Sequence, residues 1–188
     1  MILPLVYYPD ARLRAKGAPV KAIDDTLRAF ARDMLETMEQ HEGVGLAAQQ
    51  VGKALQFAVI DITGIDDEAR PSTMTVKGQA VNPEDHMPLF LINPVVTGTK
   101  AKERGSEGCL SIPGLRTDVG RSKRVTVKTV TLDGEPLEFE ATGLLAVAIQ
   151  HETDHLHGKL FIDLLTPAER AAVKDELDAI VEKYGPKE

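Results

Sequence analysis

The sequence is poor in cysteine, in positive charge and in long hydrophobic runs. Its single cysteine, Cys109, excludes an internal disulfide and is typical of a cytoplasmic protein. The formal net charge of -7 at pH 7 argues against nucleic acid or an anionic membrane as a partner. The first residues lack a basic region, and Pro4 and Asp10 interrupt the apolar run. We therefore expect neither a signal peptide nor a membrane span.

The remaining composition is that of an ordinary globular protein. Hydrophobic residues make up 43% of the 188 residues and charged residues 27%. A chain of this length suits a single domain, here residues 1–188, with enough apolar material for a sizeable core.

Hydrophobic periodicity predicts helices near both ends of the chain and strands between them. Apolar residues at helical spacing predict a helix that Asp24 or Asp25 caps and that runs to about His41. Thr166-Pro167-Ala168-Glu169 has the spacing of a capping box and predicts a terminal helix to about Tyr184. The expected strands are 55–60, 89–92, 124–129 and 137–141, with a hairpin turn at Asp133-Gly134. Residues 63–87 form a long polar connection of unassigned structure.

The strongest functional signal is His151-Glu152-Thr153-Asp154-His155. Positions four apart share one face of a helix, so His151 and His155 can hold one metal ion, with Glu152 beside them as general base. The preceding stretch, 143–149, is apolar on all sides and predicts a buried helix. On an exposed helix the two histidines would be ordinary surface residues, but buried histidines need polar partners, which a metal supplies. The expected fold is α+β, with mixed or antiparallel sheets packed around this central helix and a C-terminal helix.

A catalytic metal site needs a third protein ligand, and several residues compete for that role. In metzincin proteases a histidine follows at the position that Phe161 occupies here. A thermolysin-like arrangement would take Glu169 or Glu176 from a downstream helix. Cys109 is either a small core residue or a thiolate that completes a Cys-His-His set.

Three motifs together resemble those of one family, the peptide deformylases, in particular the bacterial type 1 enzymes. They are Gly43-Val44-Gly45-Leu46-Ala47-Ala48-Gln49-Gln50, Glu107-Gly108-Cys109-Leu110-Ser111 and Gln150-His151-Glu152-Thr153-Asp154-His155-Leu156. Residues 8–10, 91–94 and 161–163 are also similar to the family, so the resemblance covers nearly the whole chain.

The resemblance implies a reaction: removal of the formyl group from the N-terminal formyl-methionine of newly synthesised peptides, with release of formate. It also implies that Cys109, His151 and His155 bind one divalent metal. Fe²⁺ is the family's usual ion, and Ni²⁺, Co²⁺ or Zn²⁺ can replace it.

The resemblance further implies the catalytic roles. The metal would lower the pKa of its water, and Glu152 would take the proton as hydroxide attacks the formyl carbon. The metal, the Leu110 backbone N–H and the Gln50 amide would stabilise the charge on the formyl oxygen. Gln49 competes with Gln50 for this role, but it falls at a variable position of the family.

Substrate contacts are expected at both glycine-containing motifs and on the buried helix. Gly43, Val44 and Gly45 would form an edge for the peptide backbone. Gly108 and Arg116 would lie along the substrate, although Arg116 could equally be a surface residue. The pocket for the methionine side chain would be lined by Val44, Leu144, Val147 and Ala148, which could equally be core residues.

The expected partners are formyl-methionyl nascent peptides and, transiently, the ribosome, which some members contact through a basic terminal helix. The terminal helix here is net acidic, which argues against that contact. Two other classes stay open: a metallopeptidase with a glutamate as third ligand, and a non-catalytic protein with a closed four-ligand metal site.

Overall fold

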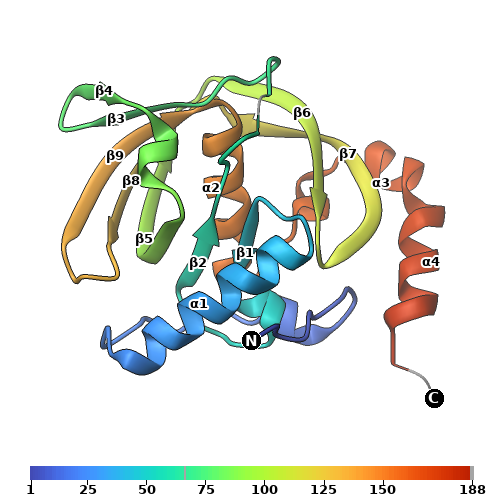
Figure 1. Cartoon of the computed structure of the whole chain (residues 1–188). Coiled ribbons are helices and arrows are strands. Elements are labelled where there is room, and N and C mark those ends of the chain that lie inside the picture. Colours follow the sequence, from blue (N-terminus) through green and yellow to red (C-terminus); the bar gives the residue numbers. More distant parts are fainter. Residues whose placement is uncertain (66, 187–188) are drawn as a thin grey trace.

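The computed structural model describes residues 1–65 and 67–186 and contains two antiparallel sheets. The strands are β1 Gly45–Ala47, β2 Phe57–Ile60, β3 Thr73–Val76, β4 Gln79–Val81, β5 Leu89–Gly98, β6 Lys102–Cys109, β7 Ile112–Ser122, β8 Arg124–Val130 and β9 Pro136–Thr142. Seven of them form one sheet in the order β1-β2-β5-β8-β9-β3-β4, and β6 and β7 form a separate hairpin (Figure 1). Every pairing between these strands is antiparallel.

The helices are α1 Asp25–Gln40, α2 Gly143–Leu156, α3 Pro167–Ala172 and α4 Lys174–Tyr184. Short 3₁₀ helices are η1 Ala11–Arg14, η2 Ala48–Val51, η3 Pro83–His86 and η4 Phe161–Leu164. With the antiparallel sheets and the helical C-terminal region, these elements confirm the predicted α+β class. Within the described ranges, none of the helices has the length and apolar character needed to cross a membrane.

Two sequence-based boundaries correspond to capping side chains. The Asp24 carboxylate accepts a hydrogen bond from the Leu27 N–H at 2.9 Å and begins α1. Thr166 and Glu169 form the predicted capping box at the start of α3. The expectation of one terminal helix was wrong, because Val173 has non-helical backbone angles and separates α3 from α4.

The polar connection 63–87 contains structure that the sequence did not indicate. It includes β3, β4 and η3, and β3 pairs with β9 to extend the large sheet. Both strands are short: β3 has four residues, of which Met74 is the one fully buried, and β4 has three, none of them buried. Runs of this length give too weak a periodic signal to predict a strand. The β6–β7 hairpin was missed because β6 is mostly exposed and polar.

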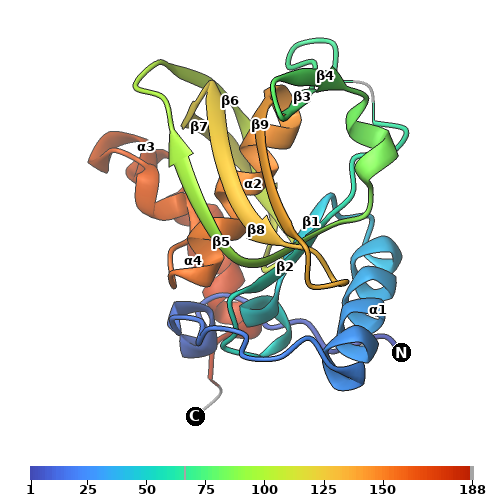
Figure 2. The same ribbon diagram turned by 90° about the vertical axis from the view of Figure 1, so that its left-hand side faces the viewer.

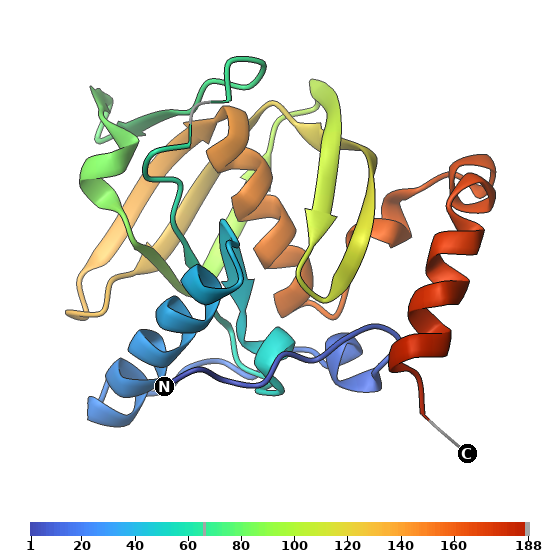
Figure 3. The ribbon, with the colours of Figure 1, turned by 45° about the vertical axis from the view of Figure 1, so that its right-hand side comes forward.

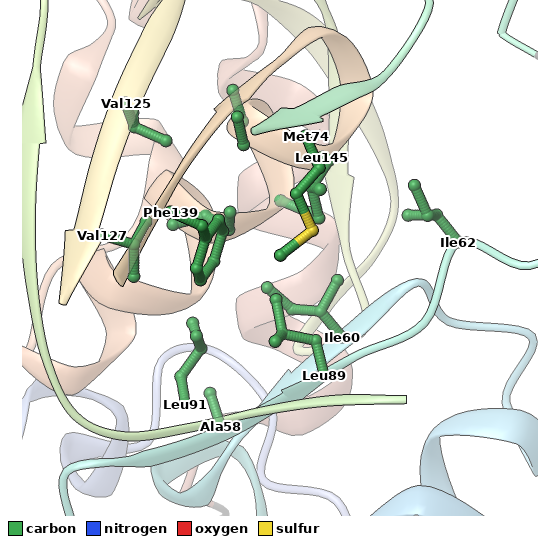
Figure 4. Packing of buried hydrophobic residues seen from close by; sticks show 14 of the residues in the cluster. Ala58, Ile60, Ile62, Met74, Leu89, Leu91, Val125, Val127, Phe139 and Leu145 are labelled. Atoms are coloured by element: carbon green, nitrogen blue, oxygen red, sulfur yellow. The ribbon is translucent and has the colours of Figure 1, made fainter. Parts of the chain in front are cut away.

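Helix α2 lies between the large sheet and the β6–β7 hairpin (Figures 1 and 3). Figure 2 shows the strands of the large sheet covering one side of it. The main core fills this contact, where Phe139, Met74 and Leu91 of the sheet form one cluster with Leu145 of the helix (Figure 4). A second core cluster joins β7 to η4 and α4, and a third packs α1 on β2.

The start of α2 is held by the segment before β3. The Leu144 N–H donates to the carbonyl oxygen of Arg70 at 3.0 Å, and the Leu145 N–H donates to the Ser72 hydroxyl at 3.0 Å. Gly143 has a φ of 66°, and a Cβ at this position would overlap the carbonyl oxygen of Pro71. The direction of α2, and thus the place of its histidines, depends on glycine at this position.

We expect Gly143→Ala to lower the free energy of unfolding by more than Gly134→Ala. Both glycines have positive φ, which costs an alanine roughly 1–2 kcal/mol, but Gly134 has open space around it. The overlap with Pro71 should add about 1–3 kcal/mol, as for overpacked positions. Urea unfolding of the two variants measures the difference, and equal losses would contradict the steric role of Gly143.

Candidate metal centre and substrate cavity

Three side chains from two elements converge to form a candidate metal site. Cys109 ends β6, and His151 and His155 lie one turn apart on α2. One ligand atom from each residue lies within 4.8 Å of those of the other two, and Cys109 Sγ is 3.3 Å from His155 Nε2. A thiolate with two imidazoles suits a divalent transition metal and leaves an open position, as in catalytic sites. The donor set therefore fits the expected metal.

The other candidate ligands are engaged elsewhere. Phe161, at the metzincin position, stacks on the His151 ring with centroids 6.0 Å apart. Glu169 caps α3 and pairs with Arg104 at 2.5 Å. Among the described residues, Glu176 is not part of a cluster that could hold a metal. His157, two residues after His155, is not one of the clustered side chains: it is exposed, and its Nδ1 lies 2.8 Å from the Thr153 carbonyl oxygen.

A buried ion-pair network orients His151. Its Nδ1–H donates to Glu107 Oε2 at 3.0 Å, and Arg121 donates two hydrogen bonds to the same carboxylate at 2.7 and 3.0 Å. Arg121 also contacts Asp154 of α2 at 2.5 Å. The bond at Nδ1 fixes the orientation of the ring. Burial opposes the charged form, but hydrogen bonds with Cys109 and Glu107 raise the pKa of His151 well above its usual value, so Nε2 would release a proton on binding a metal. Sequence reasoning quoted Glu107 as part of a motif but missed this role, and it missed Arg121 entirely.

Protonation states at the ligands follow from burial and these contacts. Burial alone would raise the pKa of Glu107, but the hydrogen bonds with His151 and Arg121 outweigh it and lower this pKa to about 2. Burial, with the nearby His151, lowers the pKa of His155 well below its usual value. His155 is therefore a neutral imidazole, the form that binds metals.

Glu152 is a buried carboxyl group with unused hydrogen-bonding capacity. It is 3% exposed, and its Oε2 has no hydrogen-bond partner among the described residues. Burial raises its pKa to about 7, where a carboxyl group can both accept and return a proton. The backbone of β1 approaches it closely, because a Cβ at Gly45 would overlap the Glu152 carboxylate.

The structure distinguishes the two neighbouring glutamines. Gln50 Oε1 accepts the Ala47 N–H at 2.8 Å, which directs Gln50 Nε2 to within 3.5 Å of Cys109 Sγ. Gln49 turns the other way, with its Nε2 3.4 Å from the Leu156 carbonyl oxygen. Gln50 is therefore the glutamine beside the candidate metal site.

A cavity of about 1030 Å³ opens beside these groups. The predicted site residues that line it are Gly43, Val44, Gly45, Gln50, Gly108, Cys109, Leu110, Arg116, Leu144, Val147, His151 and Glu152. Ala148 is 4% exposed in the main core cluster and is not among the residues that line the cavity, so its place in the methionine pocket stays a prediction. Other wall residues, including Tyr7 and Tyr184, carried no signal in the sequence.

Comparisons with known proteins agree on one family. The sequence model described as polypeptide deformylase matches residues 2–171. A peptide deformylase of Methylacidiphilum infernorum is 56% identical over 180 residues, which cover 96% of this chain and 93% of the relative.

Solved structures give the same result. The crystal structure of a peptide deformylase from Legionella pneumophila is 36% identical, with a TM-score of 0.79 and complete coverage of both chains (100% each). A peptide deformylase from Synechococcus elongatus in complex with actinonin is 38% identical, with a TM-score of 0.76, over 98% of this chain and 87% of that one. The chain therefore belongs to the polypeptide deformylase family of enzymes.

Proposed function

We propose that the chain hydrolyses the formyl group from the N-terminal formyl-methionine of newly synthesised peptides in the cytoplasm and releases formate. One observation carries the proposal: Cys109 and His151, which cluster with His155, line the same cavity as Glu152, whose buried Oε2 has no hydrogen-bond partner among the described residues. Membership of the polypeptide deformylase family supports the choice of a formyl amide as the bond that is cleaved.

Cys109, His151 and His155 would hold one divalent ion, Fe²⁺ by the family's usual preference, with Ni²⁺, Co²⁺ or Zn²⁺ as substitutes. When bound, the ion would lower the pKa of water and polarise the formyl oxygen. Glu107 keeps His151 in the ligating tautomer through its hydrogen bond to Nδ1.

The chain's own groups would move the proton and stabilise charge. Glu152, with a pKa of about 7, would take a proton from the attacking water and return it to the leaving nitrogen. The Gln50 amide and the Leu110 backbone N–H would stabilise the negative charge that develops on the formyl oxygen. Gln50 is preorganised for this by its hydrogen bond to the Ala47 N–H.

The edge of the large sheet would bind the peptide backbone. β1 is the terminal strand in the sheet order, and Gly43, Val44 and Gly45 line the cavity beside it. A free strand edge offers backbone donors and acceptors to an extended peptide. Leu144 and Val147, which lie on α2 within the cavity wall, would contact the methionine side chain together with Val44. Gly108 and Arg116 would lie along the opposite side.

Formate release tests the proposal. We expect protein loaded with Fe²⁺ or Ni²⁺ to release formate from a formyl-Met-peptide, and Glu152→Gln to lower kcat by about 10²–10⁴-fold, the usual contribution of a general base. Metal content should stay at the parent level, because Glu152 is not among the ligands. A fully metallated parent without turnover would contradict the proposal and favour a non-catalytic metal protein.

The third ligand is tested separately. We expect Cys109→Ser to lose its metal on dialysis, because a serine hydroxyl replaces the thiolate beside His155. Glu169→Gln should keep one metal ion per chain, because Glu169 pairs with Arg104 and is not a ligand. The reverse pattern of metal contents, together with cleavage of unformylated peptides, would instead indicate a metallopeptidase with a glutamate ligand.

The role of Glu107 predicts a change in metal affinity. We expect Glu107→Gln to weaken metal binding by about 10–100-fold, because the carboxylate that orients His151 is lost. Stability should fall by about 3 kcal/mol, because Arg121 keeps its charge in a buried position. Chelator competition and urea unfolding measure the two effects. Glu103→Gln, on the exposed side of β6, is the matched control, and equal metal affinity in both variants would refute the role.

A further inference from the structure

Two tyrosines from opposite ends of the chain meet in the wall of the cavity. Tyr7 and Tyr184 stack with ring centroids 4.3 Å apart and an interplanar angle of 25°. Both line the same cavity as Cys109 and Glu152. Neither residue belongs to the motifs that define the candidate catalytic groups, so the proposed hydrolysis assigns them no role.

Tyr7 is tied by backbone hydrogen bonds to the segments that carry the candidate catalytic groups. The Val6 N–H donates to the Gln50 carbonyl at 2.7 Å, and the Tyr8 N–H donates to the Ser111 carbonyl at 2.8 Å. Val6 and Tyr8 pack into the second core cluster. Leu5 and Tyr7, which alternate with them along this stretch, line the cavity.

Tyr184 is held in place by α4. Leu177 and Ile180, each 6% exposed, anchor this helix in the second core cluster, and Tyr184 packs against the same cluster. The family match ends at residue 171, so α4 lies beyond the matched segment. The Legionella deformylase structure nevertheless covers the whole chain, so α4 has a counterpart in the fold.

The cavity is larger than a formyl-methionine requires. Its volume of about 1030 Å³ is at the upper end of the about 300 to 1,000 Å³ typical of sites for drug-sized ligands. The start of α2, with Leu144, and the C-terminal end of α4, with Tyr184, lie at opposite ends of the β6–β7 hairpin (Figures 1 and 3). When the methionine side chain lies near Leu144, the two tyrosines lie at the other end of the cavity, the end that we call distal.

We propose that the stacked pair Tyr7 and Tyr184 forms a distal subsite that selects apolar or aromatic side chains in the peptide after the formyl-methionine. This inference rests on the proposed function. An extended peptide advances about 3.3 Å per residue, so chain beyond the methionine reaches further along the cavity. A stacked aromatic pair offers a large and rigid apolar face, to which Leu5 and Pro113 of the wall add.

The experiment compares kcat/KM for formate release from formyl-Met-Ala and from formyl-Met peptides of five residues. In each longer peptide, one of positions two to five is either Phe or Gly, and the other three are Ala. The parent and the variants Tyr7→Ala, Tyr184→Ala and Tyr184→Leu are all loaded with Ni²⁺. Val181→Ala is the control, because Val181 is 39% exposed on α4 and lies outside the cavity wall.

We expect the parent to prefer Phe over Gly at one of the distal positions, and Tyr7→Ala and Tyr184→Ala to reduce that preference by roughly threefold to tenfold, the equivalent of an aromatic contact. Tyr184→Leu retains apolar packing and should show a smaller reduction. Formyl-Met-Ala should be hydrolysed at the parent rate by all variants, and Val181→Ala should keep the full preference.

Three outcomes would overturn the proposal. The first is a parent without a preference at positions two to five, and the second is a preference that the tyrosine variants retain. The third is an equal loss on formyl-Met-Ala and on the longer peptides, which would show that the stack only supports the fold. Absence of formate from formyl-Met-Ala with the metallated parent would instead refute the proposed function, and the distal subsite with it.

Discussion

The buried contact between Glu107 and Arg121 is the interaction on which the rest of the site depends. Moving two such charges out of water costs several kcal/mol per ion, and this cost is met only when every charged atom has a partner. Here the carboxylate receives hydrogen bonds from both Arg121 and His151, and Arg121 reaches Asp154 as well. Because these residues come from β6, β7 and α2, the network joins the hairpin to the helix in one arrangement.

Two buried carboxyl groups near the same histidine differ because their surroundings differ. Glu107 is surrounded by donors, and its pKa is lowered to about 2. Glu152 is equally removed from water, but one of its oxygens has no hydrogen-bond partner in the described part of the chain, and burial raises its pKa to about 7. Environments that push two pKa values apart in this way separate a permanent counter-charge from a group that exchanges protons. Glu107 is therefore suited to orienting His151, and Glu152 to proton transfer.

Much of the fold could be predicted because it depends on local signals. The Asp24 cap, the capping box at Thr166 and the hairpin turn at Asp133-Gly134 correspond to observed features. The break at Val173 carries no glycine or proline signal, and the strands of the segment 63–87 are only three and four residues long, so neither could be predicted. They depend instead on distant partners, such as the pairing of β3 with β9.

The residues of the candidate site likewise fall into two groups: those predictable from local spacing and those that depend on distant contacts. The pairing of His151 with His155 is predictable, because residues four apart share one face of a helix. Cys109 was a candidate ligand as the single cysteine of the sequence. The choice between Gln49 and Gln50 was open from the residues, since neighbouring side chains differ only in direction. In the structure the hydrogen bond from the Ala47 N–H directs Gln50 toward Cys109. Arg121 lies 14 positions from Glu107 and meets it only because β6 and β7 pair.

The backbone of the N-terminal segment completes this assembly. Its N–H groups at Val6 and Tyr8 donate to the carbonyl oxygens of Gln50 and Ser111. Gln50 is itself a proposed oxyanion donor, and Ser111 directly follows the other, Leu110. The two turns that flank the candidate metal site are thus held at a fixed separation by a third segment that contributes no catalytic group. Because that same segment presents Tyr7 to the cavity, one pair of backbone hydrogen bonds ties the aromatic wall to the segments of Gln50 and Leu110, the proposed oxyanion donors.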